Sequence, residues 1–399
     1  MAKTLLNTDK ITMEFGRILH QESNFIGNVN RQYDESYKES GAKTGASIRI
    51  RTPNKFATTV GATLVEGDVV QEQVTLTVAT QRHVKLPYYT SAELAQNIEN
   101  ILESDVKPAA KQMIADIEAD ILARAYVGVP TQVSDIGNAL TFNGMTDART
   151  QLTKQLCPQD GRKLIMTPDM SGAVIKDTKG LFQSSTNIAD QYREGMLGRT
   201  AGFDCFENTL LPRHQSGTAA AVTTYLVNGT IAEGATSIPV DTGTTTFKTG
   251  DVLTFAGCYD VHPETRASRT ALKQFVVTAD YAGGSGNISV YPPMRSSASG
   301  ARQNISAIPA DNAAVSKVAG ASVAYDIGLA FHKDAFVFAT ADLPLPGGTH
   351  AASRKNVEGI SVRFIQDYDP VSDKLISRID CLYGFALVRP ELATRLGFN

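Results

Sequence analysis

The spacing of hydrophobic residues predicts a short helix, a polar arm and two strands near the start of the chain. Ile11, Phe15 and Ile18 recur at helical spacing, so residues 9–23 are predicted to form an amphipathic helix. The following run, "RQYDESYKESGAKTG", is polar and lacks periodicity, which is typical of an extended arm. The segments "ASIRIR" and "VTLTV" alternate apolar and polar residues, as half-buried strands do.

Residues 52–73, which connect these two strands, have only a weak pattern. A two-stranded ribbon is marginally stable in water, so the sequence predicts a protruding hairpin that lies on another subunit. The apolar residues that lack cover in the nearby sequence are Ile48, Ile50, Val74, Leu76 and Val78. Alternation turns Arg49 and Arg51 to the opposite, solvated or subunit-facing side.

The longest helical signal runs from Ser91 to about Tyr126 and is divided at Pro108. An apolar stripe follows its second part, and most charged residues lie away from that stripe. The stripe consists of Ala110, Met113, Ile114, Ile117, Ile121 and Leu122, and the charged residues are Asp116, Glu118, Asp120 and Arg124. This pattern predicts a long helix with one side buried against a sheet.

The rest of the chain divides into three parts. Residues 131–214 mix helices and strands: "RKLIMTPDM" is predicted to be a buried strand ending in a turn, and "STNIADQYREGMLGR" a helix. Residues 218–320 contain short alternating strands separated by "KTGD" and "GGSGN", which predicts an inserted β-barrel or sandwich. The segment "GISVRFIQDYDPVSDKLISRIDCLYGFALV" predicts a strand pair with a turn at Asp369–Pro370.

Composition and charge narrow the class of protein. With 399 residues, 42% hydrophobic and 20% charged, the chain is predicted to be folded around more than one core. A net charge of −3 argues against a protein that grips nucleic acid through its phosphates. The four scattered cysteines favour a reducing compartment, and the absence of a long apolar run predicts no membrane span.

The segment "FAGCYDVHPETRASR" carries candidate metal ligands at every second position. On an extended strand, alternate residues share a face, and thiolate, carboxylate and imidazole groups bind metals. The four residues are Cys258, Asp260, His262 and Glu264. Because Pro263 disturbs a strand at this point, we predict a charged connection between two barrel strands that binds no metal.

Three hypotheses for function follow: a structural subunit, a metal-dependent hydrolase using Cys258, Asp260 and His262, or a ligand-binding module built on the β-insertion. The sequence contains no HExxH, GxSxG or GxxxxGK[ST] motif, which weighs against an enzyme. It contains no tryptophan, which weighs against an aromatic binding platform. We therefore predict no catalytic residue, no cofactor and no metal.

Four segments, in this order, resemble the major coat proteins of tailed bacteriophages, which share the Hong Kong 97 capsid fold. They are "YREGMLGRTAGFDCFENTLLPRH", "FKTGDVLTFAGC", "GLAFHKDAFVFAT" and "RIDCLYGFALVRPEL". The resemblance is to the branch with an inserted β-barrel, typified by the Salmonella short-tailed phage coat. In that branch a long acidic loop joins the first barrel strands, whereas "NGTIAEGATSIPV" is short and carries only Glu233.

The resemblance implies an α+β fold of the Hong Kong 97 type with an inserted small β-barrel. The implied parts are an N-terminal arm (1–42), an extended loop hairpin (43–80), a peripheral domain with a spine helix (81–130), an axial domain (131–217), the inserted barrel (218–325), and a return to the peripheral and axial domains (326–399).

The resemblance also implies a non-enzymatic major capsid protein that self-assembles into the hexamers and pentamers of an icosahedral head. The implied partners are other copies of the chain, a scaffolding protein, a portal protein and packaged double-stranded DNA without sequence-specific contact. Assembly in the host bacterial cytoplasm and a place in the virion, without a membrane, follow from the same resemblance. Residues predicted to lie at subunit interfaces are Arg49, Arg51, Glu264, Arg266 and Arg269.

Overall fold

The computed structural model describes residues 12–13, 24–31, 47–56, 58, 61–62, 71–86, 89–90, 105, 107–178, 197–349, 351–357, 360–371 and 374–399. The chain divides into two compact units. Unit 1 comprises residues 1–50, 73–121 and 336–388, and unit 2 comprises residues 51–72, 122–335 and 389–399. The predicted polar arm and the helices expected at 9–23, 91–106 and 185–199 fall largely outside the described residues.

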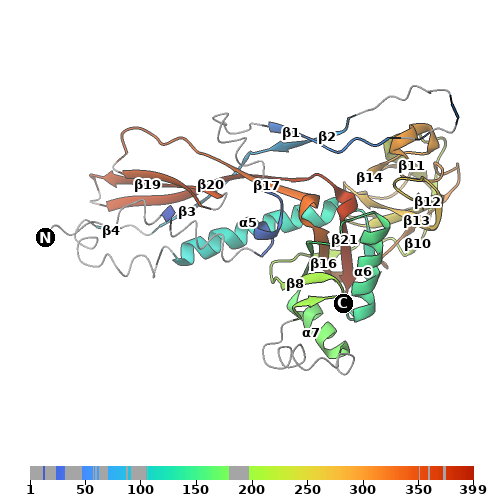
Figure 1. The fold of residues 1–399 in the computed structure, drawn as a ribbon, viewed down its shortest axis with the longest axis horizontal. Helices are drawn as coiled ribbons and strands as arrows, with labels where there is room; N and C mark the ends of the chain where they lie inside the picture. Colours follow the sequence, from blue (N-terminus) through green and yellow to red (C-terminus); the bar gives the residue numbers. More distant parts are fainter. Residues whose placement is uncertain are drawn as a thin grey trace. The chain divides into compact units, whose positions relative to one another are not determined.

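An antiparallel sheet forms the centre of unit 1, with strand order β17-β20-β19-β18 and with β3 and β4 also pairing with β20 (Figure 1). The strands are β3 (Thr80–Lys85), β4 (Tyr89–Thr90), β17 (Phe336–Ala341), β18 (Ala351–Val357), β19 (Ile360–Asp369) and β20 (Lys374–Leu387). The predicted C-terminal strand pair is confirmed, because β19 and β20 form a hairpin in which Asp369 opposes Lys374. In its turn, Asp369 Oδ1 accepts the Val371 N–H at 3.0 Å, as a turn aspartate does.

The predicted strands of the extended loop are also confirmed. They are β1 (Ser47–Arg51) and β2 (Gln73–Thr77), which pair as a two-stranded sheet. The cover that their apolar residues lack in the nearby sequence comes from strands of the same chain that are distant in sequence. Ile50, Leu76 and Val78 are buried in one cluster with Val337 and Leu382 of unit 1. Whether the loop also lies on a neighbouring subunit stays a prediction.

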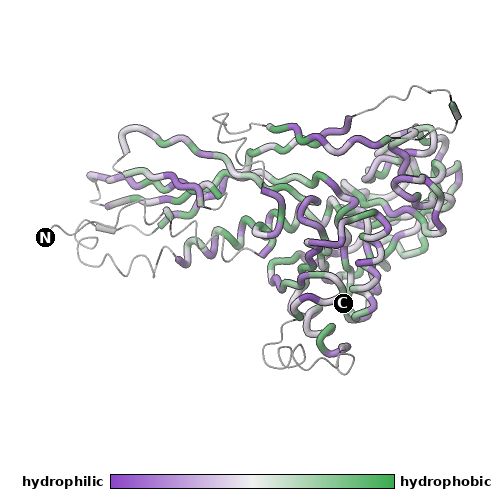
Figure 2. The backbone as a smooth tube through the Cα atoms, viewed as in Figure 1, coloured by the Kyte–Doolittle hydropathy of each residue, from purple (hydrophilic) through white to green (hydrophobic). Residues whose placement is uncertain are grey.

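The long helix is α5 (Lys107–Gly128). Its predicted apolar stripe is confirmed, because all six stripe residues are buried, and Figure 2 shows hydrophobic and hydrophilic residues mixed along its tube. Glu118 differs from the prediction, since its side chain is buried rather than turned away from the core. Its carboxylate accepts the backbone N–H of Phe25, next to the short helix η1 (Ile26–Asn28), which satisfies a donor that burial would otherwise leave without water. Among the described residues no helix is both long and apolar enough to cross a membrane.

Within the described residues, a mixed sheet and two α-helices form one part of unit 2, with strand order β5-β21-β16-β6-β8-β7 and with β9 also pairing with β16. The strands are β5 (Gln132–Asp135), β6 (Arg162–Met166), β7 (Arg199–Thr200), β8 (Phe203–Glu207), β9 (Arg213–Gln215), β16 (Ala324–His332) and β21 (Ala393–Phe398). The short helices η4 (Lys333–Ala335) and η5 (Pro390–Leu392) follow β16 and precede β21.

Each α-helix of this part begins at a threonine cap. Thr141 Oγ1 accepts the Gly144 N–H at 3.4 Å at the start of α6 (Phe142–Lys154). Thr167 Oγ1 accepts the Met170 N–H at 3.3 Å at the start of α7 (Pro168–Asp177). The buried strand predicted at "RKLIM" is confirmed as β6, but the expected turn after it is instead the first turn of α7.

The predicted inserted barrel is confirmed. Within the described residues, six strands close it in the order β10-β11-β14-β13-β12-β15. They are β10 (Val222–Val227), β11 (Ala235–Asp241), β12 (Val252–Val261), β13 (Ser268–Val277), β14 (Gly286–Met294) and β15 (Ala314–Lys317), with the short helix η3 (Ser297–Arg302) after β14. Apolar side chains, including Phe255 and Phe275 in edge contact, fill its interior, so a ligand-binding barrel receives no support.

The barrel is inserted between two paired strands of the sheet. In β9 and β16, Gln215 opposes Ala324 and His214 opposes Tyr325. The incoming linker of the barrel (216–221) therefore begins next to the point where the outgoing linker (318–323) ends.

A fragment covering residues 218–325 is expected to fold alone, because the closed barrel holds its own apolar cluster. Thermal unfolding of this fragment should be cooperative, and its amide resonances should be well dispersed. Gradual unfolding with narrow dispersion would contradict this expectation.

Candidate functional site

The four candidate metal ligands lie at the end of β12 and in the turn to β13, and the structure does not bring them together. Two register shifts of β12 against β13, on either side of Tyr259, break the alternation on which the metal hypothesis depended. Cys258 therefore lies in the barrel core. Asp260 instead contacts the residue that caps the C-terminus of α6, since its Oδ2 accepts the Gln155 Nε2–H at 3.3 Å.

Asp260 and Cys258 already have structural roles in the barrel. Asp260 Oδ2 lies 2.8 Å from Arg269 Nη1, and Asp260 Oδ1 lies 2.8 Å from Lys273 Nζ. Burial raises the pKa of the Cys258 thiol to about 12, against the weaker effect of Lys273. A neutral, buried thiol is a poor metal ligand, since metals bind the thiolate.

His262 shapes the turn itself. Its Nδ1 accepts the backbone N–H groups of Glu264 at 3.2 Å and Thr265 at 3.1 Å. Its backbone N–H donates to Ala267 O, and its carbonyl accepts the Arg266 N–H, both at 2.9 Å. One of its two ring nitrogens is therefore used as a cap for the turn.

A chelator is expected to leave the unfolding temperature unchanged. Among the described residues, no group of three or more His, Cys, Asp or Glu side chains is placed to hold a metal ion. Because the chain has no tryptophan, unfolding is best followed by circular dichroism, with and without EDTA. If EDTA lowered the unfolding temperature and added zinc raised it again, the metal hypothesis would be supported.

Side chains of β13 fasten the barrel to β5 and α6. The side-chain amide of Gln274 binds the backbone of Gln132 as a neighbouring strand would. Its Oε1 accepts the Gln132 N–H at 2.7 Å, and its Nε2 donates to Gln132 O at 3.0 Å. Arg269 Nη2 donates to Lys154 O at 2.6 Å, at the C-terminus of α6, where a cation is favourable. These side chains of β13 thus hold the barrel on β5 and α6.

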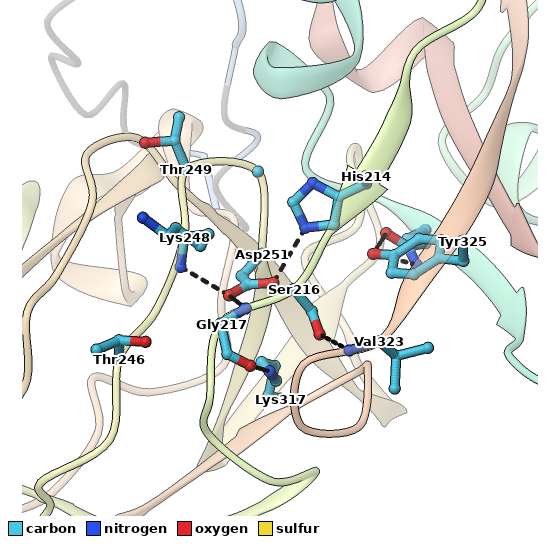
Figure 3. Close-up of polar contacts among 12 residues, drawn as sticks. His214, Ser216, Gly217, Thr246, Lys248, Thr249, Asp251, Lys317, Val323 and Tyr325 are labelled. Carbon is cyan, nitrogen blue, oxygen red and sulfur yellow. Dashed lines mark hydrogen bonds and ion pairs between the residues drawn. The ribbon is translucent and has the colours of Figure 1, made fainter.

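A buried carboxylate organises the root of the barrel, where the two linkers meet (Figure 3). Asp251, at the end of the predicted "KTGD" turn, has a side chain with 0% exposure. Its Oδ2 accepts the backbone N–H groups of Gly217 at 3.0 Å and Lys248 at 2.8 Å. Its Oδ1 lies 3.1 Å from His214 Nε2. Asp251 thus joins the incoming linker, the turn and β9.

The same root ties the incoming linker to the outgoing one (Figure 3). Lys317 Nζ donates to Gly217 O at 2.8 Å. Ser216 Oγ donates to Gly320 O at 2.8 Å and accepts the Val323 N–H at 3.0 Å. The barrel is therefore held at its base by bonds within and between its two linkers.

Electrostatics favour the ionised carboxylate at this site. Burial raises the pKa of Asp251, but the hydrogen bonds from His214 and the backbone, together with the charge of Lys317, outweigh burial and hold it below its usual value. Burial lowers the pKa of Lys317, and Asp251 opposes that shift. The buried Arg395 of β21 adds a further bond, from Nη1 to Gly250 O at 2.9 Å.

The predicted interface residues have different surroundings. Arg49, Arg51 and Glu264 are exposed, as strand alternation and the turn require. Arg269 instead pairs with Asp260, and Arg266 Nη2 donates to Phe56 O at 2.6 Å and Ala301 O at 3.4 Å of its own chain. A role for all five at subunit interfaces stays a prediction.

Sequence reasoning missed the root network. Its members His214, Gly217, Asp251 and Lys317 are separated by up to 103 positions, and no spacing rule connects them. The one available signal was the "KTGD" turn, since an aspartate in a turn commonly accepts local backbone N–H groups.

The polar groups of the root bind one another and hold the barrel on the sheet. Comparisons with known proteins identify the family of the chain. The sequence matches the family described as "P22 coat protein - gene protein 5" over residues 36–396. The chain belongs to this family and is the major capsid protein of an icosahedral phage head. The Hong Kong 97-like capsid fold implied by the resemblance is thereby confirmed.

Solved phage structures are similar to the chain at low sequence identity. One titled "Mycobacterium phage Che8" has 13% identity and a TM-score of 0.48, covering 94% of this chain and 91% of that chain. "The head structure of Helicobacter pylori bacteriophage KHP40" has 10% identity and a TM-score of 0.43, covering 89% and 85%. "Capsid structure of Staphylococcus phage Andhra" has 8% identity and a TM-score of 0.40, covering 95% and 84%. No curated protein sequence matches the chain.

Proposed function

We propose that copies of this chain assemble into hexamers and pentamers that close into a head around double-stranded DNA, with a scaffolding protein and a portal protein as partners. The family match over residues 36–396 carries this proposal. The role is structural rather than catalytic, and assembly takes place in the host cytoplasm before the protein becomes part of the virion.

The proposal assigns a part of the shell to each segment. Residues 1–42 serve as the arm, 43–80 as the extended loop, 81–130 as the peripheral domain and 131–217 as the axial domain. Residues 218–325 serve as the inserted barrel, and residues 326–399 complete the peripheral and axial domains. The fastening of the barrel by Asp251 and Asp260 supports a rigid projection from each subunit.

The charge of the chain suits a wall that encloses DNA without gripping it. A net charge of −3 leaves no basic excess to neutralise phosphates. DNA is therefore held by confinement within the shell rather than by sequence-specific contacts.

Negative-stain electron microscopy tests the proposal directly. The protein expressed with its neighbouring scaffold gene product should give closed, uniform shells, whereas the protein alone should give irregular particles or free subunits. Free subunits under both conditions would contradict the assembly proposal.

A double variant, Arg49→Glu with Arg51→Glu, is expected to abolish shells without changing the unfolding temperature by more than about 2 °C. Both side chains are exposed on β1, so a charge reversal disturbs neighbouring subunits more than the fold. The matched control is Arg49→Lys with Arg51→Lys, which keeps the charge and should form shells. Normal shells from the glutamate variant would remove both residues from the interface.

A further inference from the structure

Three arginines of the barrel gather around the extended loop of the same chain. Arg266 stands in the β12–β13 turn, Arg295 follows β14, and Arg302 ends η3. All three, with loop residues 51–72, belong to unit 2. We name Arg266, Arg295 and Arg302 the arginine clamp.

The clamp binds both arms of the loop. On the outgoing arm, Arg266 Nη2 donates to Phe56 O at 2.6 Å. On the returning arm, Arg295 forms an ion pair with the Glu72 carboxylate, and Arg302 Nη1 lies 4.0 Å from Glu72 Oε1. Between the arms, Glu72 O accepts the N–H and the hydroxyl of Thr52, each at 3.0 Å. The barrel thus recognises an extended backbone and one carboxylate.

The barrel holds these arginines ready for the loop. The Arg295 backbone is fixed by Asn304, whose Oδ1 accepts its N–H at 3.0 Å and whose own N–H donates to Arg295 O at 2.9 Å. Glu233 Oε1 accepts the Ser296 N–H at 2.7 Å, and its Oε2 accepts the Ser296 hydroxyl at 2.9 Å, which fixes the start of η3. Glu233, the single charge of the shortened loop between β10 and β11, therefore supports the clamp.

The conformation of Arg266 is a further sign of a fixed geometry. Its φ of 58° lies in the left-handed region, which is unfavourable for a residue with a side chain. The turn around His262 holds it there and directs the guanidinium toward Phe56 O. Such strain is retained where the surrounding structure dictates the conformation.

We propose that the arginine clamp is a docking surface for the extended loop of its own chain, which holds the loop in one position in the free subunit. The inference rests on the proposed function, in which copies of the chain assemble, and on the prediction that this loop lies on a neighbouring subunit. A loop fixed in advance loses less conformational entropy when a neighbour binds it, which favours assembly.

The rate at which chymotrypsin cleaves the free subunit after Phe56 tests whether the clamp holds the loop. Phe56 is 68% exposed, so its side chain is available to the protease, but the carbonyl of the Phe56–Ala57 bond is bound by Arg266. Three variants release the loop in different ways: Glu72→Gln, Arg295→Gln and Arg266→Gly, the last of which suits the left-handed φ and keeps the turn. Cleavage after Phe56 is expected to become roughly fivefold faster in each.

Two controls sharpen the result. Glu264→Gln removes an exposed carboxylate from the same turn and should cleave at the wild-type rate. Combining Glu72→Gln with Arg295→Gln should cleave no faster than Glu72→Gln alone, because Glu72→Gln already removes the ion pair that Arg295→Gln removes.

The cleavage rate also separates the proposal from its alternatives. Wild-type cleavage at Phe56 should not depend on subunit concentration, since clamp and loop share one chain. A rate that falls as concentration rises would mean that the loop docks on another copy, and unchanged cleavage in the clamp variants would mean that no clamp holds it. Either result overturns the proposal. Failure of the wild type to form shells would bear on the proposed function alone, because cleavage is measured on free subunits.

Discussion

Replacing Asp251 with asparagine is expected to lower the free energy of unfolding by about 3–5 kcal/mol. The wild-type carboxylate is buried and accepts bonds from Gly217, Lys248 and His214. Asparagine is neutral and turns one of its two acceptor atoms into a donor that faces other donors. The charge of Lys317 then loses its buried counterion. Urea unfolding followed by circular dichroism measures the loss.

The effect of this variant should depend on pH in a defined direction. The pKa of Asp251 is held below its usual value, so its contribution to stability is complete above the usual pKa of about 4. That contribution is lost as pH falls through the lower pKa of the folded state. The difference between wild type and Asp251→Asn should therefore be constant above about pH 5 and should shrink in acid.

Asp280 provides a matched control for Asp251. It binds the same turn, accepting from Lys248 Nζ at 2.7 Å and from the Thr249 N–H at 2.8 Å, but its side chain is 56% exposed. Water replaces these bonds when Asp280 becomes asparagine, so the expected loss is only about 0.2–1 kcal/mol. Equal losses for the two variants would show that burial does not give Asp251 its importance.

Alternation and helical spacing were reliable where each element has one buried face. The strands β1 and β2 and the stripe of α5 followed these periods, because burial in a core acts on every second residue of a strand or on one side of a helix. In β20 the alternation fails, since Ile379, Asp380 and Cys381 are buried in succession. Glu118 was expected on the polar side of α5 but is buried, because its carboxylate accepts the backbone N–H of Phe25 inside the core. Such a partner, 93 positions away, leaves no local pattern.

The start of α7 was missed although its signal is present. Thr167 at the cap and Pro168 at the first helical position are typical of a helix start, but the same residues also occur in turns.

The candidate site was harder to predict than the helices and strands. Register shifts in β12 separated Cys258 from Asp260, and a shift of one residue changes the face of every side chain that follows it. The root network depends on the pairing of β9 with β16, which only the folded topology brings about.

Gly217→Ala is expected to destabilise the protein by about 2–3 kcal/mol or more, because no side chain fits at the root of the barrel. A Cβ atom at Gly217 would lie 2.3 Å from Thr246 O and 2.8 Å from Phe247 Cα. Both atoms are backbone, so neither moves away as the end of a flexible side chain does. The neighbouring Thr218 and Thr246 also exchange bonds from each backbone N–H to the other's hydroxyl, at 3.1 and 2.8 Å. Accommodating the methyl group would break these bonds and weaken the hold of Asp251 on the linker.

Gly172→Ala tests the steric origin of this loss, because the same chemical change should have the opposite sign there. Gly172 lies inside α7, and a Cβ atom would meet nothing within 4 Å among the described residues. Alanine is favoured over glycine in a helix by about 0.5–1 kcal/mol, so this variant should be slightly more stable than wild type. Both variants are compared with wild type by urea unfolding, and shells of Gly217→Ala should form in lower yield because the barrel no longer projects in a fixed direction. A Gly217→Ala protein as stable as Gly172→Ala would show that the linker at the root has room to move, and the rigid attachment of the barrel would then be wrong.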